Sequence, residues 1–127
     1  MTHVVQRLAD GIVARALALG VDGVDLVQKE GCGVYNLRCD DLTSIHLTLL
    51  EKIRQSLPLG KTLSYTFPIN SGSRHLDFPF VDVVKYGLQY LDSISLMGLE
   101  GASNKTIQSA LDLGVPASKV HFITASK

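Results

Sequence analysis

The stretch from Asp22 to Glu30 reads DGVDLVQKE, and it decides the fold. A helix-like segment ends just before it at Gly20, and the β-branched content of VDGVDLV predicts a buried strand over residues 21–27. Acidic side chains accompany this strand, but Val27 and Lys29 interrupt the acids near its end. The strand is therefore a catalytic strand, a strand that has lost its acids, or an ordinary piece of core.

Helix-like and strand-like segments alternate around this stretch. Helices are expected over residues 6–19, 42–57, 79–90 and 105–113. In the first of them Leu8, Ile12, Ala16 and Leu19 are expected to face inward. Asp40 or Asp41 is expected to cap the second. Further strands are expected over residues 61–69, 91–99 and 120–123. Such alternation predicts βαβ units, in which right-handed crossovers make the strands parallel and binding groups gather at their carboxyl ends.

Length and composition indicate one soluble domain over residues 1–127. The chain is 46% hydrophobic and 19% charged, and 12 basic side chains balance 12 acidic ones, which favours neither nucleic acid nor an anionic membrane as a partner. No apolar run approaches the roughly 20 residues of a membrane span. The N-terminus lacks a signal pattern, which indicates a cytoplasmic protein, or a secreted one whose leader has been removed.

Cofactor and metal sites have no support in the sequence. The 4 histidines are scattered and do not stand at metal-ligand spacing from the 2 cysteines. No glycine pattern of the nucleotide-binding kind is present, so no cofactor is expected. Cys32 and Cys39 lie seven residues apart; two free thiols are the preferred interpretation, and a disulfide remains sterically possible.

Four segments in order resemble consecutive strands of the chitinase-like glycoside hydrolases of family 18. DGVDLVQKE resembles the DGxDxDxE of that family's fourth strand, SYTFP the end of the fifth, LDSISLMGLEG the D-x-x-x-x-M-x-Y-D of the sixth, and GVPASK the turn before the seventh. The family has a (β/α)8 barrel, which usually needs about 250 residues. The resemblance therefore implies half of a TIM-type barrel with about four parallel strands; an open α/β sandwich with helices on both faces is the alternative.

The resemblance also implies that the catalytic acid is lost. Asp22, Gly23 and Asp25 match the family pattern, whereas Val27 stands where the family has an aspartate and Lys29 where it has the catalytic glutamate. Asp92 and Met97 match the sixth strand, but Leu99 and Glu100 replace its tyrosine and aspartate. In such sites the glutamic acid protonates the leaving oxygen, so the chain is expected not to be an active glycosidase.

The resemblance and the strand positions together predict the site residues. The expected ligand-binding residues are Asp25, Lys29, Tyr65, Met97 and Glu100, while Glu30 and Glu100 are the weak candidates for a substitute acid. Two other interpretations stay open: Asp22 and Asp25 can simply bond nearby backbone, and Tyr65 or Phe67 can be core residues rather than sugar-stacking ones.

Three functions are compatible with this pattern. The leading hypothesis is a non-catalytic, lectin-like protein that binds glycans of the N-acetylglucosamine type. The alternatives are residual or altered glycosidase activity through Glu30 or Glu100, and a scaffold for protein interaction without a ligand. Half a barrel is expected to leave two open sheet edges and an apolar inner face, which predicts a homodimer or a larger homo-oligomer.

Overall fold

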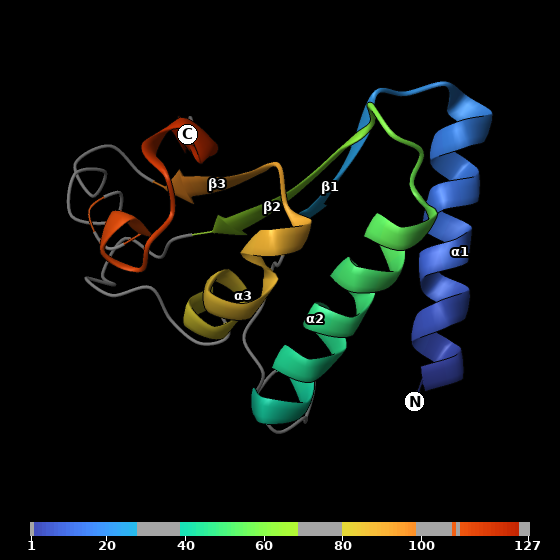
Figure 1. The fold of residues 1–127 in the computed structure, drawn as a ribbon, viewed down its shortest axis with the longest axis horizontal. Helices are drawn as coiled ribbons and strands as arrows, with labels where there is room; N and C mark the ends of the chain where they lie inside the picture. Colours follow the sequence, from blue (N-terminus) through green and yellow to red (C-terminus); the bar gives the residue numbers. More distant parts are fainter. Residues whose placement is uncertain (1, 28–38, 69–79, 99–107, 109, 125–127) are drawn as a thin grey trace.

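The computed structural model describes residues 2–27, 39–68, 80–98, 108 and 110–124 (Figure 1). Its elements are α1 (Thr2–Leu19), β1 (Gly23–Val27), α2 (Cys39–Ser56), β2 (Thr62–Pro68), α3 (Phe80–Gly87), η2 (Leu88–Tyr90), β3 (Ser93–Gly98), η3 (Ala117–Lys119) and β4 (Val120–Thr124). Residues 108 and 110–112 are also helical. The predicted alternation is confirmed, although α1 begins four residues earlier than expected and α2 begins at Cys39, so that Asp40 and Asp41 lie inside α2 instead of capping it.

The sheet has four strands in the order β1-β2-β3-β4, and every pair of neighbours is parallel. Neighbours in the sheet are also consecutive along the chain, so each connection crosses over once and carries a helical segment. This is the arrangement of half a TIM-type α/β barrel. In the part of the chain that the structure describes, β1 and β4 are edge strands, as expected for a sheet that is not closed.

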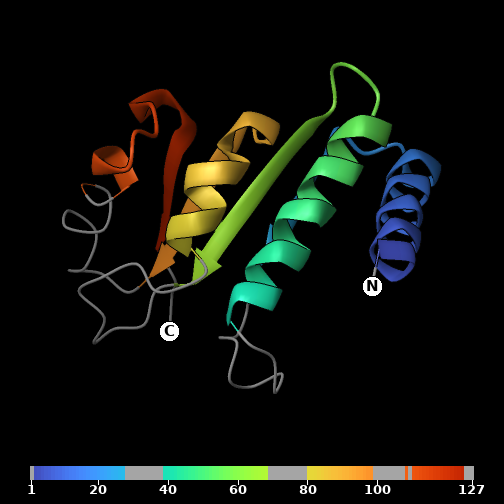
Figure 2. The ribbon, with the colours of Figure 1, turned by 60° about the horizontal axis from the view of Figure 1, so that its bottom comes forward.

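The helices lie on one face of the sheet (Figure 2). Leu63, Tyr65 and Phe67 of β2 and Ile94 and Leu96 of β3 are at most 3% exposed on that face. They form one core with helix residues that include Leu50, Ile53, Val83 and Val84. Because the described helices cover a single face, the open sandwich alternative is wrong and the half-barrel prediction holds.

The other face of the sheet is here called the helix-free face. Strand register assigns three rows of positions to it: Asp25, Ser64 and Ser93; then Val27, Thr66, Ser95 and His121; then, at the carboxyl ends of the strands, Pro68, Met97 and Ile123. The first two rows are polar apart from Val27, whereas the third consists of apolar residue types. The expectation of an apolar inner face therefore fits only the third row, because hydroxyl and charged residues take most of the alternate strand positions in the other two.

The buried side of α1 also differs from the expected one. Val5, Ala9, Val13 and Ala16 are at most 6% exposed, whereas Leu8 and Leu19, expected to be inward, are 51% and 62% exposed. The small side chains of the buried row let α1 pack closely against α2. Apolar residues cover so wide an arc of α1 that helical periodicity alone could not identify the row in contact. The end of α1 is as predicted, since Gly20 adopts a φ of 66°.

Candidate functional site

The strongest polar cluster of the helix-free face centres on Asp25 of β1. Its Oδ1 accepts a hydrogen bond of 2.7 Å from the Ser64 hydroxyl. The Thr66 hydroxyl lies 2.8 Å from Oδ2 and 3.0 Å from Oδ1 of the same carboxylate. The parallel register pairs Asp25 directly with Ser64. Thr66 is two residues further along β2 and lies on the same face of the sheet, so one carboxylate reaches both hydroxyls.

The polar row continues across the sheet beyond this cluster. Thr66 pairs with Ser95 on β3, and Ser95 pairs with His121 on β4. Thr66 is only 4% exposed, whereas Ser95 is half-buried and His121 is exposed. The helix-free face therefore combines a carboxylate, several hydroxyls and an imidazole, which together can both donate and accept hydrogen bonds.

Val27 interrupts the row on the β1 edge. It pairs with Thr66 and is 46% exposed. According to the sequence resemblance, an aspartate stands at this position in the catalytic relatives. Among the described residues of these rows, Asp25 carries the one carboxylate.

Tyr65 does not lie at the helix-free face, which corrects its predicted role in ligand binding. It is 1% exposed in the core, and its ring stacks on Phe67 with centroids 4.3 Å apart. Its hydroxyl is in hydrogen-bonding contact with Nδ1 of His46 on α2. Since Tyr65 shares the face of Leu63 and Phe67, the core interpretation of both aromatic residues is the right one.

His46 is a half-buried titratable group behind the sheet. Desolvation by burial lowers the pKa of the His46 imidazole below its ordinary value of 6.5. The neutral form is therefore favoured, and this form leaves one ring nitrogen able to accept a hydrogen bond. From the sequence, His46 had been considered only as a metal ligand, and no suitable spacing had been found.

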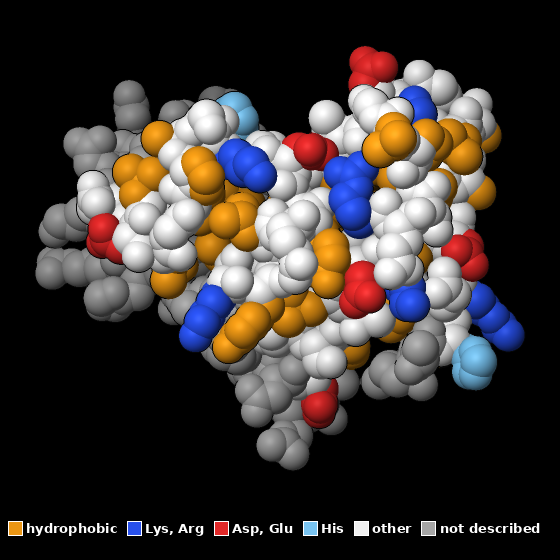
Figure 3. All heavy atoms as spheres, viewed as in Figure 1, with side chains coloured by type: hydrophobic (Ala, Val, Ile, Leu, Met, Phe, Trp, Pro, Cys, Tyr) orange, Lys and Arg blue, Asp and Glu red, His pale blue; other side chains and the backbone are white. Residues whose placement is uncertain are grey.

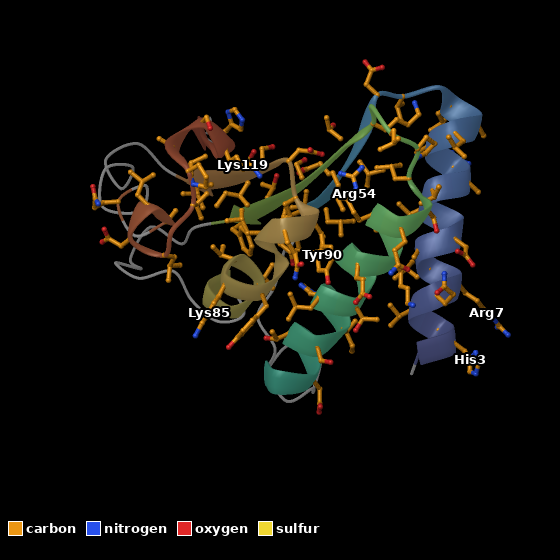
Figure 4. The ribbon with its side chains drawn as sticks, in the orientation of Figure 1. His3, Arg7, Arg54, Lys85, Tyr90 and Lys119 are labelled. Atoms are coloured by element: carbon orange, nitrogen blue, oxygen red, sulfur yellow. The ribbon has the colours of Figure 1, made fainter. Side chains whose placement is uncertain are left out.

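Asp92, which matches the family pattern of the sixth strand, lies at the amino end of β3, away from the carboxyl ends of the strands. Its Oδ2 accepts hydrogen bonds from the backbone N–H of Leu63 at 2.8 Å and from Nη1 of Arg54 at 2.9 Å. Arg54 reaches from α2 toward the sheet and also donates from Nη2 to the carbonyl oxygen of Lys61 at 2.8 Å (Figure 4). This cluster ties α2, β2 and β3 together and has a structural role.

Several predicted site residues lie outside the described part of the chain. Lys29, Glu30 and Glu100 fall in residues 28–38 and 99–107, as does Cys32. The backbone of Met97 belongs to β3, where it pairs with Pro68 and Ile123. The two candidates for a substitute acid, Glu30 and Glu100, and the question of a Cys32–Cys39 disulfide therefore fall outside the described residues.

The hydroxyl residues of the helix-free face were missed by the sequence prediction, although the sequence carries a signal for them. Ser64 and Thr66 alternate with buried Leu63, Tyr65 and Phe67. Ser93 and Ser95 alternate with Ile94 and Leu96 in the same way. Alternate polar positions in two neighbouring strands indicate a polar face of the sheet.

A groove lies on the outer surface, on the helix side of the sheet. It has a volume of about 400 Å³ and lies between α2 and the α3–η2 segment, with Thr43, Thr48 and Glu51 on one side and Tyr86 and Tyr90 on the other. Figure 4 shows Tyr90 between these elements. The Thr43 hydroxyl is buried, and it has no hydrogen-bond partner among the residues that the structure describes.

Metal and membrane sites were also sought in the described residues. Within residues 2–27, 39–68, 80–98, 108 and 110–124, no group of three or more His, Cys, Asp or Glu side chains could hold a metal ion. No helix in this part of the chain is long and apolar enough to cross a membrane.

Comparison with known structures identifies the fold. A GH18 chitinase from Pseudoalteromonas aurantia superposes with a TM-score of 0.71 over 95% of this chain, at 19% sequence identity. The fold of this chain is GH18-like. The chain spans 48% of the length of that chitinase. No family model matches the sequence, and no curated protein matches it either.

The GH18-like fold agrees with the four sequence segments that resemble this family. A likeness at 19% identity establishes the architecture and not the activity. What the helix-free face does must therefore be inferred from its own side chains.

Proposed function

We propose that this chain is a non-catalytic chitinase-like protein that binds a glycan of the N-acetylglucosamine type at the helix-free face. The observation that carries the proposal is the hydrogen-bonded cluster of Asp25, Ser64 and Thr66. The GH18-like fold supports a carbohydrate as the ligand class.

The cluster has hydrogen-bonding capacity left for a ligand. A carboxylate offers about four lone-pair sites, and two hydroxyls occupy part of those on Asp25. The hydroxyl of Ser64 donates to Asp25, and its oxygen can still accept a hydrogen bond. Sugar hydroxyls both donate and accept, so they match such a mixed set of groups. Asp25 is itself exposed, which leaves its carboxylate accessible to a ligand.

The non-catalytic assignment rests on two residue identities in the DGVDLVQKE stretch. A hydrolase needs an acid to protonate the leaving oxygen. The chain has Val27 and Lys29 at the two positions where the related enzymes carry acids. Val27 offers no proton, and a lysine lacks the carboxyl chemistry that an acid with a raised pKa supplies.

The proposal predicts hydrogen-bonded recognition with modest affinity. Tyr65 and Phe67 are buried on the opposite face of the sheet, and the protein contains no tryptophan. The usual aromatic platform for a sugar ring is therefore not available from these residues. Binding should depend on the Asp25 cluster more strongly than it would at a site with stacked rings.

Isothermal titration calorimetry with N-acetylglucosamine trimer tests the proposal. We expect binding to the unmodified protein and a loss of about tenfold in affinity in Asp25→Asn, because one charged hydrogen-bond acceptor is worth about 1.5 kcal/mol or more. Asp22→Asn is the matched control, since Asp22 is exposed and precedes β1. A glucose trimer tests the requirement for the N-acetyl group.

Two results would contradict this function. No heat of binding at millimolar N-acetylglucosamine trimer would exclude the glycan ligand. Turnover of a chromogenic chito-oligosaccharide by the unmodified protein would exclude the non-catalytic assignment, and its loss in Glu30→Gln or Glu100→Gln would identify the acid.

A further inference from the structure

The two edges of the sheet are both available for pairing. In the described part of the chain, β1 pairs only with β2 and β4 only with β3. Each edge strand therefore presents outward-facing backbone N–H and C=O groups. Open edges of this kind favour pairing with a further strand.

An exposed apolar stripe lies beside the β1 edge. Val4, Leu8 and Leu19 of α1 are 64%, 51% and 62% exposed, and Ile12 between them is half-buried against the core. These four residues, here called the α1 stripe, are spaced by four, four and seven positions, so they share one side of the helix. Figure 3 shows hydrophobic side chains exposed over α1.

The position of α1 indicates which part of a larger sheet the α1 stripe would pack against. The buried row of α1 packs against α2. Figures 1 and 2 place α1 outside β1, where the sheet has no strand behind it. In a TIM-type barrel the helix before a strand covers the junction between that strand and the preceding one. The α1 stripe therefore lies where a strand paired to the free edge of β1 would be covered.

We propose that a second copy of this chain supplies that strand and that the two copies close an eight-stranded barrel about a two-fold axis. In this arrangement β4 of each copy pairs with β1 of the other, and both pairings are parallel. Two sheets of four strands give the eight strands of a closed barrel. In this two-fold arrangement the β1 and β4 edges of both copies, four edges in all, find a strand partner. An unrelated partner that supplied a single strand could not pair all of them.

The length of a second copy fits the rest of such a barrel. The chain spans 48% of the GH18 chitinase whose fold it shares, so the remainder of that barrel is close to one further copy. Val120 at the β4 edge is half-buried and belongs to the helix-covered side of the sheet. It offers the α1 stripe of the other copy an apolar contact across the junction.

The α1 stripe adds apolar contact area to the strand pairing. The 18-residue helix α1 is about 27 Å long, so a stripe about 10 Å wide offers roughly 300 Å². This is a substantial part of the roughly 800 Å² per partner of a typical specific interface, to which the two strand pairings also contribute. Arg15 lies on the same side of α1, and its aliphatic stem can pack while its charge reaches water.

Light scattering after size-exclusion chromatography, over a range of micromolar concentrations, tests the closure. We expect twice the monomer mass of 13.7 kDa for the unmodified protein. Leu8→Lys should weaken dimerisation by about tenfold or more, because it places a charge in an apolar contact. Leu17→Lys is the matched control: Leu17 is 48% exposed on the same helix, but it faces about 180° away from Leu8.

A monomeric mass for the unmodified protein at all concentrations would overturn the proposal. Equal dimerisation of Leu8→Lys and Leu17→Lys, or growth into open polymers, would also overturn it. Circular dichroism of both variants checks that each remains folded. In a closed barrel the helix-free face would line the interior, so a glycan would reach the Asp25 cluster from the carboxyl ends of the strands. No ligand enters the mass measurement, so it is read separately from the glycan titration.

Hydrogen exchange distinguishes edge pairing from a dimer formed through another surface. We expect the amides of β1 and β4 to be protected in the unmodified protein and to exchange faster in Leu8→Lys, while those of β2 and β3 keep their protection in both. A dimer whose β1 and β4 amides exchange at the same rate as those of the monomeric variant would contradict the closure.

Discussion

The hydroxyl of Thr66 on β2 donates a hydrogen bond of 2.8 Å to the carboxylate of Asp25 on β1. Thr66 is 4% exposed, so this carboxylate satisfies a polar group that water does not readily reach. Asp25 thereby has a structural role in addition to the proposed role in ligand binding. The two roles can be separated by measuring stability and affinity on the same variants.

Asp25→Ala should lower the free energy of unfolding by about 1–3 kcal/mol, because it leaves the buried Thr66 hydroxyl without its acceptor. Ser64→Ala should cost less, since Ser64 is half-buried and its hydroxyl can bond to water. Urea denaturation followed by circular dichroism measures both. An Asp25→Ala protein as stable as the unmodified one would show that the cluster does not stabilise the β1–β2 pair.

Gly23→Ala should destabilise the sheet at the start of β1. A Cβ atom at Gly23 would lie 2.1 Å from Oγ1 and 2.6 Å from the carbonyl oxygen of Thr62. The second contact is with backbone, so the strands must separate locally, at a cost of about 1–3 kcal/mol. Combining Gly23→Ala with Thr62→Ala should recover only part of the loss.

Gly11→Ala is the matched control for this substitution. A Cβ atom at Gly11 meets nothing within 4 Å. Because alanine favours a helix interior over glycine by about 0.8–1 kcal/mol, Gly11→Ala should stabilise the protein. Equal effects of the two substitutions in thermal unfolding would contradict the close approach at Gly23.

His46 should make the stability depend on pH in mildly acidic solution. Burial lowers the pKa of His46 in the folded state below the ordinary value of 6.5. The unfolded chain therefore binds more protons than the folded one as the pH falls below 6.5, and stability decreases with it until the pH passes the lower pKa of the folded state. Above pH 6.5 this contribution should be constant.

Urea denaturation at several pH values, compared between the unmodified protein and His46→Gln, measures that contribution. The slope between pH 6.5 and 5 should be smaller in the variant. His121 is exposed on β4, so His121→Gln is the matched control for the histidine-to-glutamine change itself. A slope that is the same in His46→Gln as in the unmodified protein would exclude His46 as its source.

Thr43→Val should stabilise the protein by about 1 kcal/mol, because it replaces a buried hydroxyl, unpartnered within the described part of the chain, by a methyl group of similar size. Thr48→Val, in the same groove, is the control, since Thr48 is only half-buried and should gain little. Thermal unfolding measures both variants. A loss of stability in Thr43→Val would mean that the hydroxyl has a partner in solution.

Local signals in the sequence predicted most of the architecture. Gly20 ends a helix, and β-branched segments alternate with amphipathic ones, which is sufficient to predict a parallel sheet covered by helices. The order of four segments indicated the family whose fold the chain shares. The predictions of where α2 begins and of which row of α1 is buried were wrong. Helix ends, and the choice among adjacent apolar rows, depend on the element against which the helix packs.

The candidate site was less predictable. The sequence groups Leu63, Tyr65 and Phe67 on one side of β2 and Ser64 and Thr66 on the other, but it does not say which side faces the helices. Tyr65 was expected at the ligand face and lies in the core instead.

Local pattern in the sequence was sufficient to predict the order of the elements and the parallel sheet, and the family resemblance implied that Val27 and Lys29 stand where acids are expected. Only the tertiary structure decided that Asp25 meets Ser64 and Thr66, that Tyr65 is buried beside His46, and that Leu8 and Leu19 are exposed. The period of two residues in a strand, or of 3.6 in a helix, groups the side chains that share a face. Packing between segments distant in the sequence then decides which of these faces is buried.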